Sequence, residues 1–173
     1  MSTLNAISPD KLFRLVGTHS CPAILDVRDA QPSLIPASRP LHVKAVESCA
    51  GDSAPPAIVV CEGGGSRSAG AAALLRSKGL DAEILEGGFA AWTAAGLPLV
   101  DASKLPPRDA DGRTRWVTRA RPKVDRIACP WLIRRFVDPR AIFLFVAPSE
   151  VEEVASDLDA AAFDYEGVFW SHR

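Results

Sequence analysis

Short apolar runs alternate with helix-like segments through the first hundred residues. Each run is four or five residues long, which suits a strand that is buried on both faces. Strands that alternate with helices in this way form a mainly parallel sheet covered on both sides, so we expect a three-layer α/β/α domain. The expected strands are 23–27, 57–60 and 82–85, and the expected helices are 9–16, 69–78 and 89–95.

Prolines and polar residues mark the connecting segments. Five prolines lie between residues 30 and 56, so we expect loops there with one brief strand over 41–46. Residues 97–114 are polar and contain prolines, as interdomain linkers do. We therefore divide the chain into a domain over 1–100, a linker over 101–114 and a smaller α+β unit over 115–173, which we expect to be incomplete at its C-terminal end.

The second unit has its own expected elements. They are a strand over 116–118, a helix through 124–136, a strand over 142–146 and a helix opened by a capping box of Ser149 and Glu152. Pro130 should kink the first of these helices or start a new one. The helical spacing places Trp131 and Cys129 in the core rather than in a ligand site.

Charge is segregated along the chain, although the net charge is only −1. Residues 101–140 carry 11 basic and 5 acidic side chains, whereas residues 141–173 carry 1 and 7. The basic block would attract nucleic acid, a small oxyanion or the acidic block that follows it. With 47% apolar and 24% charged residues, the chain as a whole has the composition of a globular protein and not that of a disordered one.

No apolar run is long enough to span a membrane, and the N-terminus lacks the features of a secretory signal. We therefore expect a cytoplasmic protein. The four cysteines show neither a C-x-x-C pair nor a metal-ligand spacing, so we expect no zinc site and no disulfide framework. A cysteine that matters here should act as a thiol.

One cysteine stands where a thiol can be activated. Cys61 directly follows the expected strand 57–60 and precedes three glycines and a helix. Glycines allow successive backbone N–H groups to turn towards one point, and the positive end of the helix dipole faces the same point. The result is an anion cradle with a sulfur at its base, in which the thiolate is favoured without a histidine partner. The cradle residues are Glu62, Gly63, Gly64, Gly65, Ser66, Arg67 and Ser68.

These residues resemble the rhodanese superfamily over about residues 7–100. The likeness is carried by Ile24–Arg28, by the loop Cys61–Ser68 and by the stretch from Leu85 to Pro98. The resemblance implies a sulfurtransferase in which Cys61 takes sulfur from an anionic donor such as thiosulfate, holds it as a persulfide and passes it to a thiol acceptor. It implies no metal or organic cofactor. Arg67 would bind the donor, while Asp26, Arg28 and Glu86 would be structural.

Two departures from the family pattern keep a second function open. Five residues separate Cys61 from Arg67, where sulfurtransferases of this kind usually have four. The longer loop resembles that of the phosphatase and arsenate-reductase members, whose cradle fits a tetrahedral oxyanion. In addition, the customary Gly-His-Ile-Pro-Gly stretch survives only as Ile35-Pro36-Ala37. An oxyanion (arsenate or chromate) reductase or a phosphatase-like enzyme is therefore the alternative.

The second unit resembles the chromate-resistance (ChrB-like) domain from about Trp116 to the end of the chain. The basic stretch from Trp116 to Phe136 carries the likeness, and the terminal Ser171-His172-Arg173 fits it. A strand-to-helix passage can present several cations to one small anion such as chromate. A non-enzymatic chromate sensor or transcriptional regulator is thus a third reading, although no helix-turn-helix pattern favours DNA. The candidate anion-binding residues are Arg119, Arg121, Lys123 and Arg126.

Overall fold

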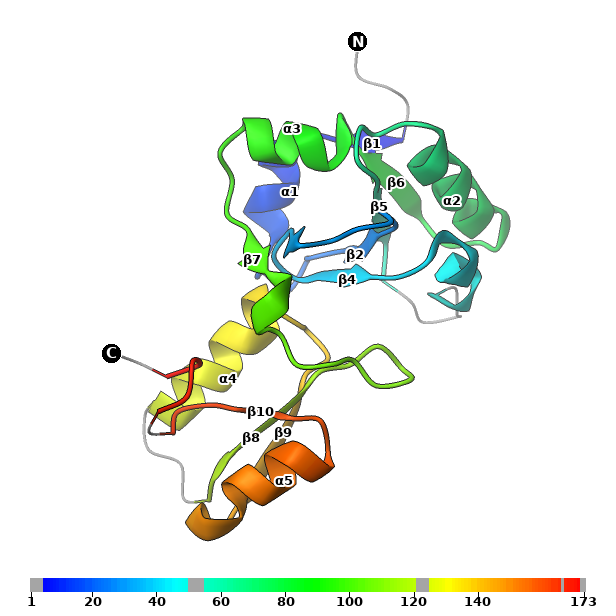
Figure 1. The fold of residues 1–173 in the computed structure, drawn as a ribbon. Coiled ribbons are helices and arrows are strands. Elements are labelled where there is room, and N and C mark those ends of the chain that lie inside the picture. The colour runs from blue at the N-terminus through cyan, green and yellow to red at the C-terminus, as the bar shows by residue number, and fades with distance from the viewer. Residues whose placement is uncertain (1–4, 50–54, 121–124, 166, 172–173) are drawn as a thin grey trace. The chain divides into compact units, whose positions relative to one another are not determined.

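The first unit, residues 1–100, is built on a five-stranded parallel sheet. The computed structural model describes residues 5–49, 55–120, 125–165 and 167–171 and divides the chain into this unit and a second one, 101–173. The strand order is β1-β6-β5-β2-β4, and every pairing is parallel (Figure 1). The strands are β1 (Ala6–Ile7), β2 (Ala23–Asp26), β4 (Ser38–Pro40), β5 (Ala57–Val60) and β6 (Ala82–Leu85).

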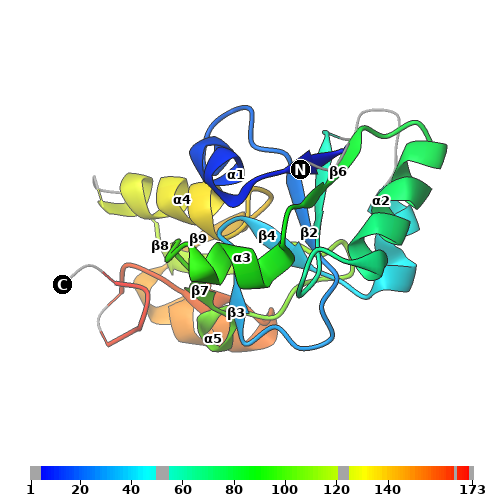
Figure 2. The same cartoon turned by 90° about the horizontal axis from the view of Figure 1, so that it is seen from above.

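Helices cover both faces of this sheet, which confirms the expected α/β/α architecture. The α-helix α2 and the 3-10 helix η1 lie on one face, and α1 and α3 lie on the other (Figure 2). All four residues of β5 are buried because the strand is covered on both sides. The helices are α1 (Pro9–Leu15), η1 (Val43–Cys49), α2 (Ser66–Ser77) and α3 (Gly88–Ala94).

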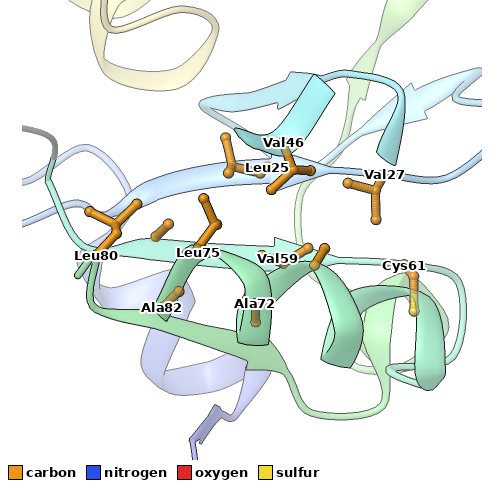
Figure 3. Close-up of a cluster of buried hydrophobic side chains, with 11 residues drawn as sticks. Leu25, Val27, Val46, Val59, Cys61, Ala72, Leu75, Leu80 and Ala82 are labelled. Carbon is orange, nitrogen blue, oxygen red and sulfur yellow. The ribbon is translucent and has the colours of Figure 1, made fainter. Parts of the chain in front are cut away.

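The core beneath α2 extends to the candidate nucleophile. Val46 of η1 and Leu75 of α2 are fully buried against Leu25 and Val59 of the sheet, and Cys61 lies at the edge of the same cluster (Figure 3). The opposite core contains Trp92, whose indole is fully buried and donates to the Pro98 carbonyl at 3.0 Å. Cys61 is thus held by the packing of the domain.

The brief strand expected over 41–46 is wrong. The proline-rich segment instead forms β3 (Ser33–Leu34), β4 and then η1. The helical start is favoured locally because the His42 Nδ1 atom accepts from the Lys44 N–H at 3.2 Å. Burial of one side chain of η1, Val46, under α2 then takes the place of the alternating pattern of a strand.

The turn over residues 35–38 stands where the family pattern has a Pro-Gly pair, and here it forms without glycine. The Ser38 N–H donates to the Ile35 carbonyl at 3.0 Å, and Ala37 has a φ of +64°. A positive φ at the third residue is what a type II turn requires, and it normally selects glycine. Ala37 therefore holds a left-handed conformation that is costly for a residue with a Cβ.

The second unit contains a three-stranded sheet in the order β10-β8-β9, and its strands are parallel too. Its core consists of Trp116, Ile133, Val137, Ala141 and Phe163. The fold class is therefore confirmed: an α/β domain with a parallel sheet, followed by a smaller unit. The elements from residue 100 onward are β7 (Val100–Asp101), η2 (Ala102–Lys104), β8 (Arg115–Arg119), α4 (Asp125–Phe136), β9 (Ile142–Val146), η3 (Pro148–Glu150), α5 (Val151–Asp157) and β10 (Ala161–Ala162).

The core position expected for Trp131 and the capping box expected from Ser149 and Glu152 are both wrong. Trp131 is 55% exposed, because α4 buries Ile133 instead, with Cys129 one turn earlier packed against the same core. The helix runs through Pro130 as one element. The cap of the next helical segment comes from Glu150, whose carboxylate accepts from the Ala147 N–H at 3.1 Å, and not from Ser149.

A buried ion pair fixes the end of β2. Asp26 is fully buried, and its carboxylate accepts from the Arg28 side chain at 2.7 to 3.1 Å and from the Arg28 backbone N–H at 3.1 Å. The Arg28 guanidinium also donates to the Ser33 carbonyl and lies 3.4 Å from the centre of the Phe89 ring. These contacts tie β2, β3 and α3 together, which is the structural role expected for this pair.

Asp26→Ala should lower the free energy of unfolding by about 3 kcal/mol, because removing one partner leaves the other charge buried and unpaired. Urea denaturation followed by circular dichroism would measure the loss. The matched control is Asp81→Ala, which removes an exposed carboxylate from the same unit and should change the stability by less than about 0.5 kcal/mol. Equal effects of the two variants would contradict the structural role of the buried pair.

Candidate active site

Cys61 lies at the carboxyl end of β5, directly before a loop that leads into α2. Its side chain is buried, with the residue 6% exposed. The loop is closed from behind by the start of α3, where the Phe89 and Ala90 N–H groups donate to the carbonyls of Cys61 and Glu62, each at 2.9 Å. The backbone of the loop is therefore fixed on its far side, which leaves its N–H groups free to turn towards the sulfur.

Glycine is required at two places where this loop meets α3. Gly64 has a φ of +68°, and a Cβ there would lie 2.9 Å from the Gly87 nitrogen and the Leu85 carbonyl oxygen. A Cβ on Gly88 would lie 2.4 Å from the Cys61 carbonyl oxygen. Gly88 lies in the stretch from Leu85 to Pro98, and its close approach to the cysteine loop follows from the tertiary structure and from no local sequence signal.

The sulfur of Cys61 is surrounded by hydrogen-bond donors. The Ser68 hydroxyl oxygen lies 3.0 Å from Sγ and 3.1 Å from the Gly65 carbonyl oxygen. Backbone N–H groups of Ser68, Gly65 and Gly64 also point at the sulfur. When the thiol ionises, the hydroxyl can turn its proton from the carbonyl to the thiolate.

These donors set the ionisation of the thiol. Burial raises the pKa of Cys61, but the hydrogen bonds from the Ser68 hydroxyl and from the three backbone N–H groups outweigh burial, so that the pKa lies below its ordinary value. The thiolate is stabilised chiefly by the loop and the first turn of α2. Among the residues that the structure describes, the groups that lower the pKa of Cys61 include no histidine.

Arg67 is engaged at the mouth of the site. Its guanidinium forms an ion pair with Asp29 at 2.6 Å and donates to the Val27 carbonyl at 3.2 Å. The hydrogen bond and the charge of Asp29 raise the pKa of Arg67, and the hydrogen bond from Arg67 lowers the pKa of Asp29. Apart from its position one residue after Arg28, no feature of the sequence indicates a role for Asp29.

A cavity of about 510 Å³ opens above the sulfur. Arg28 forms part of its wall, and Glu62 lies at 3.8 Å from the Arg28 guanidinium with its own side chain 71% exposed. Ser68, whose hydroxyl oxygen lies 3.0 Å from the sulfur, and Gly64 are not among the lining residues. The cavity is lined by Arg28, Asp29, Ala30, Cys61, Glu62, Gly63, Gly65, Ser66 and Arg67.

Of the four candidate anion-binding residues of the second unit, the structure describes the side chain of Arg119. Arg119 donates to the Asp164 carbonyl at 3.4 Å and lies 5.8 Å from the centre of the Tyr165 ring. Arg121, Lys123 and the side chain of Arg126 lie outside the described residues.

In the part of the chain that the structure describes, no group of three or more His, Cys, Asp or Glu side chains could hold a metal ion. Among the same residues, no helix is long and apolar enough to cross a bilayer.

Comparison with family models gives two matches on the chain. Residues 8–95 match the rhodanese-like domain, and residues 116–173 match the C-terminal domain of ChrB. A curated relative, protein ChrB of Cupriavidus metallidurans, is 43% identical over 74 residues, which make up 41% of this chain and 21% of the relative. The chain thus spans about a fifth of the length of that relative.

A solved structure shares the fold of the first unit. The thiosulfate sulfurtransferase of Pseudomonas aeruginosa is 24% identical with a TM-score of 0.51, over 57% of this chain and 20% of the other. A rhodanese-related protein of Thermoplasma volcanium is 24% identical with a TM-score of 0.49, over 56% of this chain and 98% of the other.

Ser68→Ala should raise the pKa of Cys61, because it removes a hydrogen bond that stabilises the thiolate. The thiolate is the form present above the pKa, so alkylation by iodoacetamide at neutral pH should slow by roughly three- to tenfold. Alkylation rates measured across a range of pH would give the pKa directly. The matched control is Ser77→Ala on the same helix, whose hydroxyl donates to the Leu74 carbonyl and should leave the profile unchanged. An unchanged profile for Ser68→Ala would contradict the assigned hydrogen bond.

Proposed function

Because the chain belongs to the rhodanese-like family, with a ChrB C-terminal domain following its rhodanese-like domain, we propose that it is a sulfurtransferase that carries sulfur as a persulfide on Cys61. The observation that carries this proposal is the buried thiol with a lowered pKa at the base of an open cavity. A thiolate is the nucleophile of such chemistry, and a buried structural cysteine would have a raised pKa instead.

The proposed reaction follows from the positions of the hydrogen-bond donors around the sulfur of Cys61. The Cys61 thiolate attacks the outer sulfur of a donor such as thiosulfate, the S–S bond of the donor breaks, and sulfite leaves with the electron pair. The new persulfide places its negative charge on the outer sulfur, above the loop whose N–H groups surround Sγ. Those fixed dipoles stabilise the charge without reorganising. A thiol acceptor then attacks the outer sulfur and releases Cys61 as the thiolate.

The other cysteines are consistent with a reducing compartment. All four, Cys21, Cys49, Cys61 and Cys129, are free thiols in the structure. Persulfide transfer to a thiol acceptor requires reduced thiols, which the cytoplasm maintains. We therefore place the protein in the cytoplasm. The C-terminal match links it to the chromate-resistance proteins, so chromate stress is the setting in which we place the activity.

A second candidate function is oxyanion chemistry, such as a reductase or phosphatase reaction. The observation that favours it is the length of the loop, with five residues between Cys61 and Arg67. The same thiolate would then attack arsenic, chromium or phosphorus in a tetrahedral oxyanion. The donors around the sulfur serve either reaction, and the product formed on Cys61 distinguishes them.

Exposure of the reduced protein to excess thiosulfate, and separately to cysteine persulfide, should add the mass of one sulfur atom. Intact-mass spectrometry measures the gain, and cyanide should remove it as thiocyanate. Cys61→Ala should take up no sulfur. Cys21→Ala is the matched control, because Cys21 belongs to the same unit and lies outside the cavity, and it should load like the wild type.

The opposite outcome has a clear meaning. If neither donor loads a Cys61 that iodoacetamide still alkylates, persulfide transfer is wrong. The oxyanion reaction would then be tested by hydrolysis of an aryl phosphate and by reduction of arsenate or chromate with a thiol reductant.

A further inference from the structure

The cations of the cavity are already neutralised by carboxylates. Arg67 is paired with Asp29 at 2.6 Å, and Arg28 is paired with the buried Asp26 at 2.7 Å. Glu62 adds a further carboxylate 3.8 Å from Arg28. Two arginines and two acidic side chains therefore line the cavity, with a third carboxylate directly behind Arg28.

This balance disfavours a doubly charged donor. When Cys61 ionises, the thiolate adds one more negative charge at the base of the cavity. Thiosulfate would bring two negative charges to a wall that offers no net positive charge among its side chains. The N–H groups of the loop remain as attractive dipoles, but they already stabilise the thiolate. A donor with one negative charge meets a smaller repulsion.

We propose that Asp29 is a specificity-determining residue, whose carboxylate neutralises Arg67 at the mouth of the cavity and makes Cys61 accept sulfur from singly charged persulfides in preference to dianions such as thiosulfate. The inference rests on the proposed sulfurtransferase function and names its donor class. Asp29 is 77% exposed in its side chain, so it lies where an incoming donor passes and not in the core.

A persulfide that also carries an ammonium group suits this surface best. Its outer sulfur enters the cavity, and the ammonium group can pair with the exposed carboxylates of Asp29 and Glu62. In the transfer, the Cys61 thiolate attacks the outer sulfur of R–S–S⁻, a new S–S bond forms at Sγ, the S–S bond of the donor breaks, and R–S⁻ leaves with the electron pair. The total charge is unchanged, and no oxidant is required.

The test compares two donors on the full chain. Sulfur loading of Cys61 is followed by mass, and kcat/KM is determined for thiosulfate and for cysteine persulfide. Wild type should prefer the persulfide. Asp29→Asn should raise kcat/KM for thiosulfate by roughly five- to tenfold at low salt, because it removes one negative charge close to a dianion. The same variant should lower kcat/KM for cysteine persulfide, because the ammonium group of that donor loses a carboxylate partner. The gain should shrink at 0.15 M salt, where the screening length is about 8 Å.

Two further variants separate charge from other effects. Asp29→Glu keeps the charge and should keep the selectivity of the wild type. Glu47→Gln removes a half-exposed carboxylate that pairs with Lys78 at 3.6 Å and takes no part in the cavity lining. This variant should leave kcat/KM unchanged for both sulfur donors. An Asp29→Asn enzyme with the same ratio of the two kcat/KM values as wild type would overturn the proposal, as would a wild type that prefers thiosulfate.

A second measurement does not depend on sulfur transfer. The rates of Cys61 alkylation by anionic iodoacetate and by neutral iodoacetamide are compared, and their ratio cancels any change in the thiolate fraction. Asp29→Asn should raise the iodoacetate-to-iodoacetamide ratio severalfold, and an unchanged ratio would overturn the role of Asp29. If this ratio shifts while neither donor loads Cys61, the assigned charge effect stands and the proposed sulfurtransferase function is what is wrong.

Discussion

The contact between the cysteine loop and the start of α3 is the constraint on which the rest of the site depends. Two backbone hydrogen bonds from Phe89 and Ala90 hold the carbonyls of Cys61 and Glu62. Glycines at 64 and 88 permit the backbones to approach closely enough to form them. Because the loop is fixed before any ligand enters, binding an anion does not require the protein to order itself. Its free-energy cost lies mainly in removing water from the ligand.

Much of the first unit could be predicted from the sequence, because its signals are local. The runs at 23–27, 57–60 and 82–85 were read from composition and length, and they form β2, β5 and β6. The order of strand, cysteine, glycines and helix was sufficient to expect an anion cradle. The structure adds the hydrogen-bond donors themselves, among which is the Ser68 hydroxyl, 3.0 Å from the sulfur.

The features that the sequence did not predict depend on contacts between residues that are distant in the sequence. Asp29 and Arg67 are 38 positions apart, and nothing in either neighbourhood indicates that they pair. The segment around Val46 becomes a 3-10 helix because α2 covers it, which the prolines alone do not reveal. The helical spacing of apolar residues predicts a core position for Trp131, but α4 has apolar residues on more than one face, and tertiary packing decides which face is buried.

Two cysteines of the first unit have opposite character. Burial raises the pKa of Cys21, against a smaller opposing effect of a backbone hydrogen bond at Gly17, whereas the donors around Cys61 lower its pKa. An electrophile that reacts with the thiolate form will therefore react faster with Cys61 than with Cys21. A fluorophore or a ¹⁹F reporter can therefore be attached at Cys61 with Cys21 left in place. The signal of such a label would report on any molecule that enters the cavity.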